Sequence, residues 1–125
     1  MPSPATRPTV LLVEDDFLVR ECTAALLVEL GCEVIEADNG LDALALLREV
    51  ETVRLLFTDC RMPGMDGPTL AAIAARMRPG LAIVLATGYH DALPTHWPIL
   101  HKPYLMAHVQ PVLERLLPEL SSAAA

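Results

Sequence analysis

Short apolar segments of strand length alternate with segments of helical spacing along almost the whole chain, and this alternation most limits the possible folds. Thr9–Val13 and 81–86 carry uninterrupted apolar runs, and 53–58 carries the run Leu55-Leu56-Phe57 after Arg54, whereas Glu33–Ala37 alternates between apolar and charged residues. A fifth short strand is expected at 98–101. Continuous apolar strands are typical of parallel sheets, in which helices cover both faces. The pattern therefore predicts an α/β domain with a five-stranded parallel sheet.

The segments between these strands carry helix signals. Gly31 is expected to end the first helix, and proline in the first turn favours the third. The predicted helices are 17–30, one that opens at Asn39-Gly40, 68–77 and 104–117. The last is expected to be interrupted or kinked near Pro111. Strands that alternate with helices predict a doubly wound sheet of order 2-1-3-4-5, in which strands one and three end side by side.

The length of 125 residues suits one compact domain. We expect the domain to span residues 9–117, with loose tails at 1–8 and 118–125. Neither a run of roughly 18 apolar residues nor a secretory leader is visible, so the sequence predicts a cytoplasmic protein without a membrane span.

Charge and cysteine content exclude several classes of function. The formal net charge is −7, which gives no basic face for nucleic acid or an anionic membrane. Cys22, Cys32 and Cys60 have neither the spacing of a disulfide framework nor that of a metal site. We expect all three to be small core residues of a reduced protein.

Polar residues follow four of the five predicted strands at the point where each ends. Glu14 and Asp15 follow the first strand, and Asp59 follows the third. Thr87 follows the fourth and Lys102 the fifth. Parallel strands bring their carboxyl ends to one edge, so three carboxylates are expected to meet there and to need a cation; Mg²⁺ suits such hard oxygen ligands. Carboxylate, divalent metal, ammonium and hydroxyl are the groups that phosphoryl transfer requires.

Each of these signals has an ordinary structural explanation when taken alone. The acidic run that ends in Asp16 suits a helix N-terminus, and Thr87-Gly88 suits a turn. Lys102-Pro103 suits a helix start. The coincidence of all of them with successive strand ends favours a functional site.

The segments VLLVEDD, LLFTDCRMPGMDG, LATGY and HKPY, in this order, resemble the receiver domain of two-component response regulators. The resemblance runs from about Thr9 to Leu117 and implies a flavodoxin-like fold. It implies that Asp59 accepts a phosphoryl group from a histidine kinase or a histidine phosphotransfer protein. It also implies that Asp15, Asp59 and the backbone carbonyl of Arg61 hold Mg²⁺, with Glu14 assisting through water.

The same resemblance assigns roles around the phosphoryl group. Lys102 is expected to pair with its oxygens, Thr87 to swing in and donate a hydrogen bond, and Gly88 to leave access. In this family the positions of Arg61 and Tyr89 flank the water that hydrolyses the acyl phosphate, so their side chains are expected to lengthen its lifetime.

The sequence departs from the family pattern between the fourth and fifth strands. Fourteen residues separate Thr87 from Lys102, and Pro94 lies among them. The fourth helix is therefore predicted to be short, irregular or mobile. The position three residues before the lysine, where the family carries a switch aromatic, is Ile99.

The segment LATGY is similar to a subgroup of stand-alone receivers marked by a Phe-Ala-Thr-Gly-x-Tyr signature. Leu85 replaces the phenylalanine and Tyr89 directly follows the glycine. Tyr89 is expected either to take over signalling from the missing aromatic or to cap the core.

Output is expected through binding of another protein or as a phosphate sink. The partner face is predicted around the fourth-helix region, the fifth strand and the last helix. Its expected switch residues are Gly88, Tyr89, Ile99 and Tyr104, and its apolar candidates are Trp97, Leu105, Met106 and Val109.

Four other functions are alternatives to this one. A haloacid-dehalogenase-like phosphatase needs a second aspartate where Arg61 stands, and a flavodoxin-like cofactor binder needs a less acidic first loop. A degenerate, binding-only receiver is disfavoured by the intact acids, threonine and lysine. A receiver domain cut from a hybrid histidine kinase remains an alternative.

Overall fold

The computed structural model describes residues 7–88 and 95–124. Five strands form one parallel sheet of order β2-β1-β3-β4-β5. The strands are β1 (Thr9–Val13), β2 (Glu33–Ala37), β3 (Val53–Asp59), β4 (Ala82–Thr87) and β5 (Ile99–His101). The helices are α1 (Phe17–Glu29), α2 (Gly40–Glu49), α3 (Gly67–Met77), α4 (Met106–Leu116) and α5 (Pro118–Ala124). The predicted sheet, its strand order and its doubly wound fold class are confirmed.

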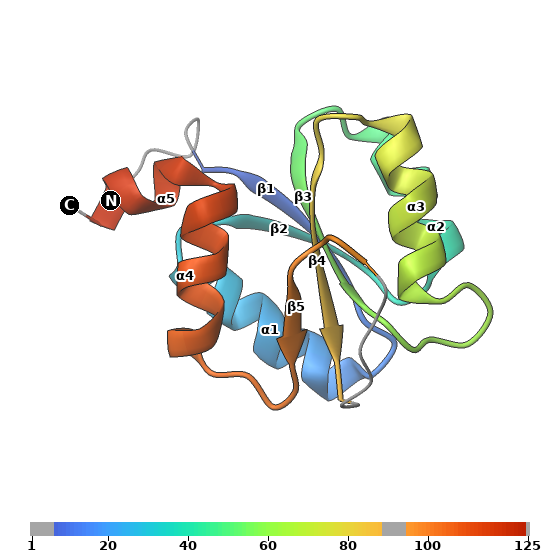
Figure 1. Cartoon of the computed structure of the whole chain (residues 1–125), viewed down its shortest axis with the longest axis horizontal. Coiled ribbons are helices and arrows are strands. Elements are labelled where there is room, and N and C mark those ends of the chain that lie inside the picture. The colour runs from blue at the N-terminus through green and yellow to red at the C-terminus, as the bar shows by residue number, and fades with distance from the viewer. Residues whose placement is uncertain (1–6, 89–94, 125) are drawn as a thin grey trace.

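Two hydrophobic clusters lie on opposite faces of the sheet. Figure 1 shows α2 and α3 on one face and α1, α4 and α5 on the other. Alternate residues of β1 supply the two clusters: Leu11 and Val13 pack toward α2 and α3, whereas Val10 and Leu12 pack toward α1 and α4. All five residues of β1 are buried, which explains its continuous apolar sequence.

Short polar side chains start three of the helices. Asp16 caps α1 by accepting a hydrogen bond from the amide of Val19 at 3.1 Å. Asn39 and Asp66 cap α2 and α3 in the same manner. Gly31, with a φ of 105°, ends the turn after α1, as predicted.

The C-terminal segment differs from the expectation of a loose tail. Residues Pro118–Ala124 form α5, and Leu120 is 4% exposed within the cluster beneath α4. Glu119 also forms an ion pair with Arg54, from the start of β3. An apolar anchor and a tertiary ion pair thus order a segment that is otherwise short and weakly patterned.

Two further expectations are corrected in part. Helix α4 runs from Met106 to Leu116 through Pro111, so the expected interruption is absent, and the alternative of a kink remains a prediction. Cys32 and Cys60 are buried, as expected, but Cys22 is exposed on α1. The short, irregular helix predicted between Thr87 and Lys102 includes residues 89–94, which lie outside the described residues, as does Tyr89. Within the described ranges, no helix is long and apolar enough to cross a bilayer.

Candidate functional site

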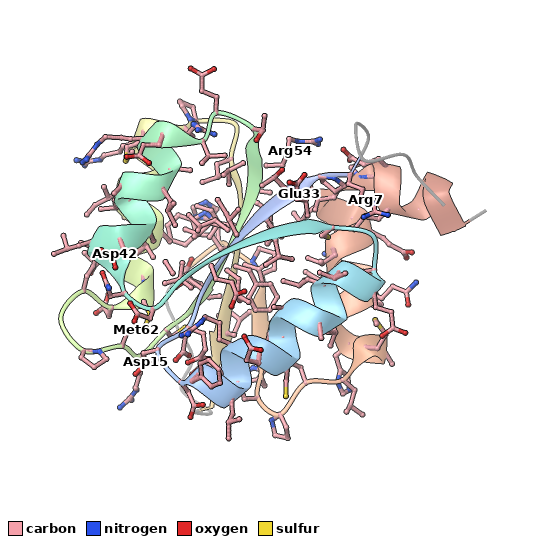
Figure 2. The ribbon with its side chains drawn as sticks, turned by 180° about the vertical axis from the view of Figure 1, so that it is seen from behind. Arg7, Asp15, Glu33, Asp42, Arg54 and Met62 are labelled. Carbon is pink, nitrogen blue, oxygen red and sulfur yellow. The ribbon has the colours of Figure 1, made fainter. Side chains whose placement is uncertain are left out.

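The carboxyl ends of β1 and β3 bring three carboxylates together. One oxygen from each of Glu14, Asp15 and Asp59 lies within 4.8 Å of the others. Glu14 and Asp59 are buried, and Asp15 is exposed. Figure 2 shows Asp15 and Met62 at this end of the molecule, and Arg54 at the opposite end. The three acids are thus close together, as predicted from the strand ends.

Lys102 reaches into the same cluster from the residue after β5. Its Nζ lies 2.6 Å from Oε1 of Glu14 and 3.2 Å from Oδ1 of Asp59. Burial alone lowers the pKa of Lys102, but the hydrogen bond to Glu14 and the charge of Asp59 outweigh it and raise the pKa above its usual value. Lys102 is therefore a fixed positive charge at neutral pH.

Glu14 is held on all sides by other groups of the chain. Its amide donates to the carbonyl of Ala37 at 3.1 Å, and its carbonyl accepts from Nη1 of Arg20 at 2.8 Å. Of its carboxylate oxygens, Oε1 accepts from Lys102 and Oε2 accepts from the amide of Asp16 at 3.1 Å. The Glu14 carboxylate thus joins Lys102 to the turn that leads into α1.

Asp59 is the last residue of β3 and is 8% exposed. Its Oδ1 accepts a hydrogen bond from the amide of Cys60 at 3.0 Å. The thiol of Cys60 lies in the same buried region, and its pKa is raised to about 11 by burial and by the charge of Asp59. At neutral pH this thiol is therefore protonated and is a poor nucleophile.

Gly67 lets helix α3 start against the backbone of the acidic strand. A Cβ atom added at Gly67 would lie 2.1 Å from the carbonyl oxygen of Asp59 and 2.8 Å from Cα of Cys60. The Gly67 amide donates to the Cys60 carbonyl at 2.8 Å. The loop that contains Met62 and Gly64 thus closes tightly onto the end of β3.

Thr87 ends β4 beside this cluster and is buried. Its carbonyl accepts a hydrogen bond from the amide of Lys102 at 2.7 Å, which ties the ends of β4 and β5 together. Gly88 follows and is exposed, with open space where a Cβ would lie. Arg61 is exposed in the loop after β3, and the metal-binding role of its carbonyl remains a prediction.

The residues predicted for the partner face pack on both sides of the edge strand β5. Ile99 and Trp97 pack against the cluster on the α2 and α3 side, whereas Tyr104 packs on the α1 and α4 side. The Tyr104 hydroxyl lies 2.7 Å from Oγ1 of Thr23 on α1, and its ring makes an edge contact with Phe57. Val109 is fully buried, and Leu105 is exposed. The strand alternation at β5 separates Ile99 from the residues of the last helix.

The donor set fits a hard divalent cation. Three carboxylates gather around a single nearby ammonium, and oxygen ligands of this kind suit Mg²⁺. Asp15 supplies the exposed carboxylate, and its pKa is raised by partial desolvation and by the proximity of Glu14. A cation at this cluster would relieve that repulsion.

The sequence motifs did not point to Arg20 as a residue of this site. Its guanidinium contacts the backbone carbonyl of Glu14 and the carboxylate of Glu36, and both contacts depend on the tertiary fold. Gly67, in contrast, ends the recognised segment LLFTDCRMPGMDG and packs against the Asp59 carbonyl.

Comparison with known proteins places the chain in a family. The family profile described as "Response regulator receiver domain" matches residues 10–96. The response regulator receiver protein CpdR of Brucella abortus is 35% identical over 86% of this chain and 95% of its own length. The transcriptional regulatory protein AruR of Pseudomonas aeruginosa is 40% identical over 69% of this chain, which spans only 36% of that protein.

Solved structures agree with this assignment. The crystal structure of the receiver domain from hybrid histidine kinase CckA superimposes with a TM-score of 0.77 at 34% identity, over 87% of this chain and 98% of that one. The signal receiver domain of an HD domain-containing protein from Pseudomonas fluorescens Pf-5 superimposes with a TM-score of 0.82 at 29% identity, over 93% and 98% of the two chains. The chain therefore belongs to the receiver domains of two-component response regulators.

Proposed function

We propose that Asp59 accepts a phosphoryl group from the phosphohistidine of a histidine kinase or a histidine phosphotransfer protein. The observation that supports this most strongly is the position of Asp59 at the end of β3, 3.2 Å from Nζ of Lys102 and within the carboxylate cluster. In such receivers a carboxylate is the nucleophile, and catalysis consists mainly of positioning and charge neutralisation.

The proposed step balances as a simple displacement. A carboxylate oxygen of Asp59 forms a bond to phosphorus while the bond between phosphorus and the donor histidine nitrogen breaks. That nitrogen keeps the bonding electron pair, and the donor ring, which carries a proton on its other nitrogen, leaves as neutral imidazole. Lys102 neutralises one phosphoryl oxygen, and the hydroxyl of Thr87 donates to another after a side-chain movement.

Mg²⁺, when bound, would neutralise the charge shared by the carboxylate and the incoming phosphoryl group. Asp15 and Asp59 are the proposed side-chain ligands, together with the backbone carbonyl of Arg61. Glu14 would act mainly by holding Lys102, since both of its carboxylate oxygens already accept hydrogen bonds from the chain.

We further propose output by protein binding, or a role as a phosphate sink, in the cytoplasm. The likeness to CpdR, which this chain matches over 95% of that protein's length, supports a stand-alone receiver. The likeness to the CckA receiver domain supports the alternative, a receiver from a hybrid kinase. The family is one of signalling phosphoacceptors, so the phosphatase alternative loses its main support.

The side chain of Arg61 is proposed to slow the loss of phosphate by shielding the acyl phosphate from water. Replacing Arg61 by asparagine should then shorten the phosphorylated lifetime. Unchanged decay in Arg61→Asn would remove this part of the proposal. Tyr89 is proposed to contribute in the same way, and Tyr89→Ala provides the parallel test.

Intact-mass measurement tests the function. The parent, Asp59→Ala and Asp38→Ala are each incubated with Mg²⁺ and either acetyl phosphate or phosphoramidate; Asp38 is an exposed acid that follows β2. One phosphoryl group on the parent and on Asp38→Ala, and none on Asp59→Ala, is the expected result. No phosphoryl group on the parent from either donor, in protein shown to bind Mg²⁺, would contradict the proposal.

A further inference from the structure

We propose that Arg20 is a positioning residue that orients the Glu14–Asp15 peptide and thereby sets the Mg²⁺ affinity of the carboxylate cluster. The inference rests on the proposed function, because it concerns the cation that phosphoryl transfer needs. Arg20 lies on the first turns of α1, outside the motifs that mark the site. Its side chain is 17% exposed.

Three contacts from three elements hold the guanidinium. Nη1 of Arg20 donates to the carbonyl of Glu14 at 2.8 Å, just beyond the end of β1. Nε lies 3.3 Å from Oε1 of Glu36, on the neighbouring strand β2. The guanidinium carbon lies 5.6 Å from the ring centroid of Phe17, on α1 itself. The planar fork of arginine allows all three contacts at once, whereas a lysine ammonium has no such geometry.

The contact with the Glu14 carbonyl acts on the next residue. A carbonyl oxygen fixed in space fixes the plane of its peptide bond, because the peptide unit is rigid. The peptide that Arg20 holds is the one that leads into Asp15, the exposed member of the cluster. The amide side of Glu14 is fixed separately by Ala37. Arg20 therefore fixes the peptide that enters Asp15, while the Asp16 amide, on the far side of Asp15, is held by Oε2 of Glu14.

Position and charge make opposite predictions for this residue. A positive charge beside the cluster repels a cation, so a purely electrostatic role implies that loss of Arg20 tightens Mg²⁺ binding. A positioning role implies the reverse, because groups that orient a metal ligand commonly change metal affinity by about 10–100-fold. Arg20→Lys keeps the charge and removes the fork, and it separates the two roles.

The test is titration calorimetry with Mg²⁺ alone on the parent, Arg20→Lys, Arg20→Gln and Arg54→Lys. Arg54 is the matched control, since it pairs with Glu119 far from the cluster. We expect Mg²⁺ to bind about tenfold more weakly to Arg20→Lys and to Arg20→Gln, the lower end of that range. Arg54→Lys should bind as the parent does. Thermal unfolding of each variant shows whether it is folded at the temperature of the titration.

The Mg²⁺ affinity of Arg20→Lys decides between the positioning role and the electrostatic role. Parent-like Mg²⁺ affinity in Arg20→Lys overturns the proposal, and tighter binding in Arg20→Gln would then assign a purely electrostatic role. If Arg20→Lys does not fold, Glu36→Gln replaces it; this change loosens Arg20 from β2 and should weaken Mg²⁺ binding in the same direction, whereas unchanged binding overturns the proposal.

The two proposals fail separately in this design. A parent that takes up phosphate, with an Arg20→Lys variant that binds Mg²⁺ normally, removes the inference about Arg20 and leaves the function. A parent that takes up no phosphate, with weakened Mg²⁺ binding in Arg20→Lys, removes the function and leaves the inference.

Discussion

At the amino end of β3 the guanidinium of Arg78 donates to backbone carbonyls, while at the carboxyl end of the same strand three carboxylates surround one lysine. Arg78 follows α3, and its acceptors are the carbonyls of Leu47, Val50, Glu51 and Val53, at 2.6–3.2 Å. These carbonyls lie in the last turn of α2, in the connection that follows it and at the first residue of β3. One cation thus satisfies many neutral acceptors at this end of the sheet.

The carboxylate cluster is arranged differently. Glu14 and Asp59 share the ammonium of Lys102, and Asp15 adds a further negative charge. The comparison indicates that the Arg78 end contributes stability, whereas the cluster retains repulsion that a cation and a phosphoryl group can use. Substitutions at the Arg78 end should therefore mainly lower stability, whereas substitutions at the cluster should also affect phosphorylation or Mg²⁺ binding. One substitution in the cluster should raise stability.

The largest expected effect is at the Arg78 end. Arg78→Ala should lower the free energy of unfolding by about 3–4 kcal/mol, since several carbonyls in a half-buried region lose a charged donor. Urea denaturation measures this, and Arg76→Ala, at an exposed arginine two residues earlier, should change stability by less than about 0.5 kcal/mol. Folded Arg78→Ala should still take up phosphate. A stability loss below about 1 kcal/mol would show that water replaces the guanidinium at little cost.

The next largest effect is expected at the carboxylate cluster, where one substitution should lower both the stability and the rate of phosphorylation. Gly67→Ala places a Cβ against the Asp59 carbonyl. This carbonyl belongs to the backbone, so it cannot move aside as the end of a flexible side chain would. We expect a loss of about 2–3 kcal/mol in stability and slower phosphorylation. Gly80→Ala is the control, because a Cβ at Gly80 meets nothing within 4 Å. Phosphorylation at the parent rate in Gly67→Ala would show that Asp59 keeps its position.

A smaller effect is expected where the segment after Lys102 meets α1. Tyr104→Phe removes the hydroxyl contact with Thr23 and should lower stability by about 1 kcal/mol. Burial raises the pKa of Tyr104 even though the Thr23 hydrogen bond opposes this, so the hydroxyl is neutral at physiological pH. A double-mutant cycle with Thr23→Ala measures the pair. Additive effects would mean that the two hydroxyls contribute independently.

The smallest expected effect has the opposite sign. The pKa of Asp15 is raised by partial desolvation and by Glu14, so ionisation of Asp15 disfavours the folded state as the pH rises through that pKa. At pH 7 without Mg²⁺, Asp15→Asn should therefore be more stable than the parent, by roughly 0.5 kcal/mol. Thermal unfolding in the presence of a chelator measures the difference.

The stability gained in Asp15→Asn can be checked by lowering the pH. The gain should disappear below the usual carboxyl pKa, where Asp15 is protonated in both the folded and the unfolded state. Added Mg²⁺ should stabilise the parent more than Asp15→Asn. A less stable Asp15→Asn at pH 7 would contradict the view that the cluster retains repulsion.

The strands and the acidic site were predictable because buried parallel strands leave continuous apolar runs whose ends are visible in the sequence. Asp59 and Lys102 could be placed from those ends alone. Arg20 and Arg78 could not, because their partners are backbone carbonyls whose positions exist only in the folded chain. The role of Glu14 as the holder of Lys102 was likewise beyond the sequence, which shows three acids without showing how their oxygens are shared.

The C-terminal half of the chain was harder to predict for different reasons. Val109, Leu113 and Leu117 recur at intervals of four residues, which predicts a buried stripe and should have excluded Val109 from a partner face. Helix α5 depends on Leu120 and on the ion pair of Glu119 with Arg54, neither of which local sequence reveals. The likeness to the Phe-Ala-Thr-Gly-x-Tyr subgroup remains a prediction, since Tyr89 lies outside the described residues.

The central claim, that Asp59 is the acceptor, is tested most directly by chemical trapping. After incubation with Mg²⁺ and acetyl phosphate, borohydride reduces an aspartyl phosphate to homoserine, and peptide mass spectrometry then locates the converted residue. We predict homoserine at position 59, and none when Mg²⁺ is removed by a chelator. Conversion at Asp15 or Glu14 instead, or phosphate uptake that leaves Asp59 unconverted, would contradict the account.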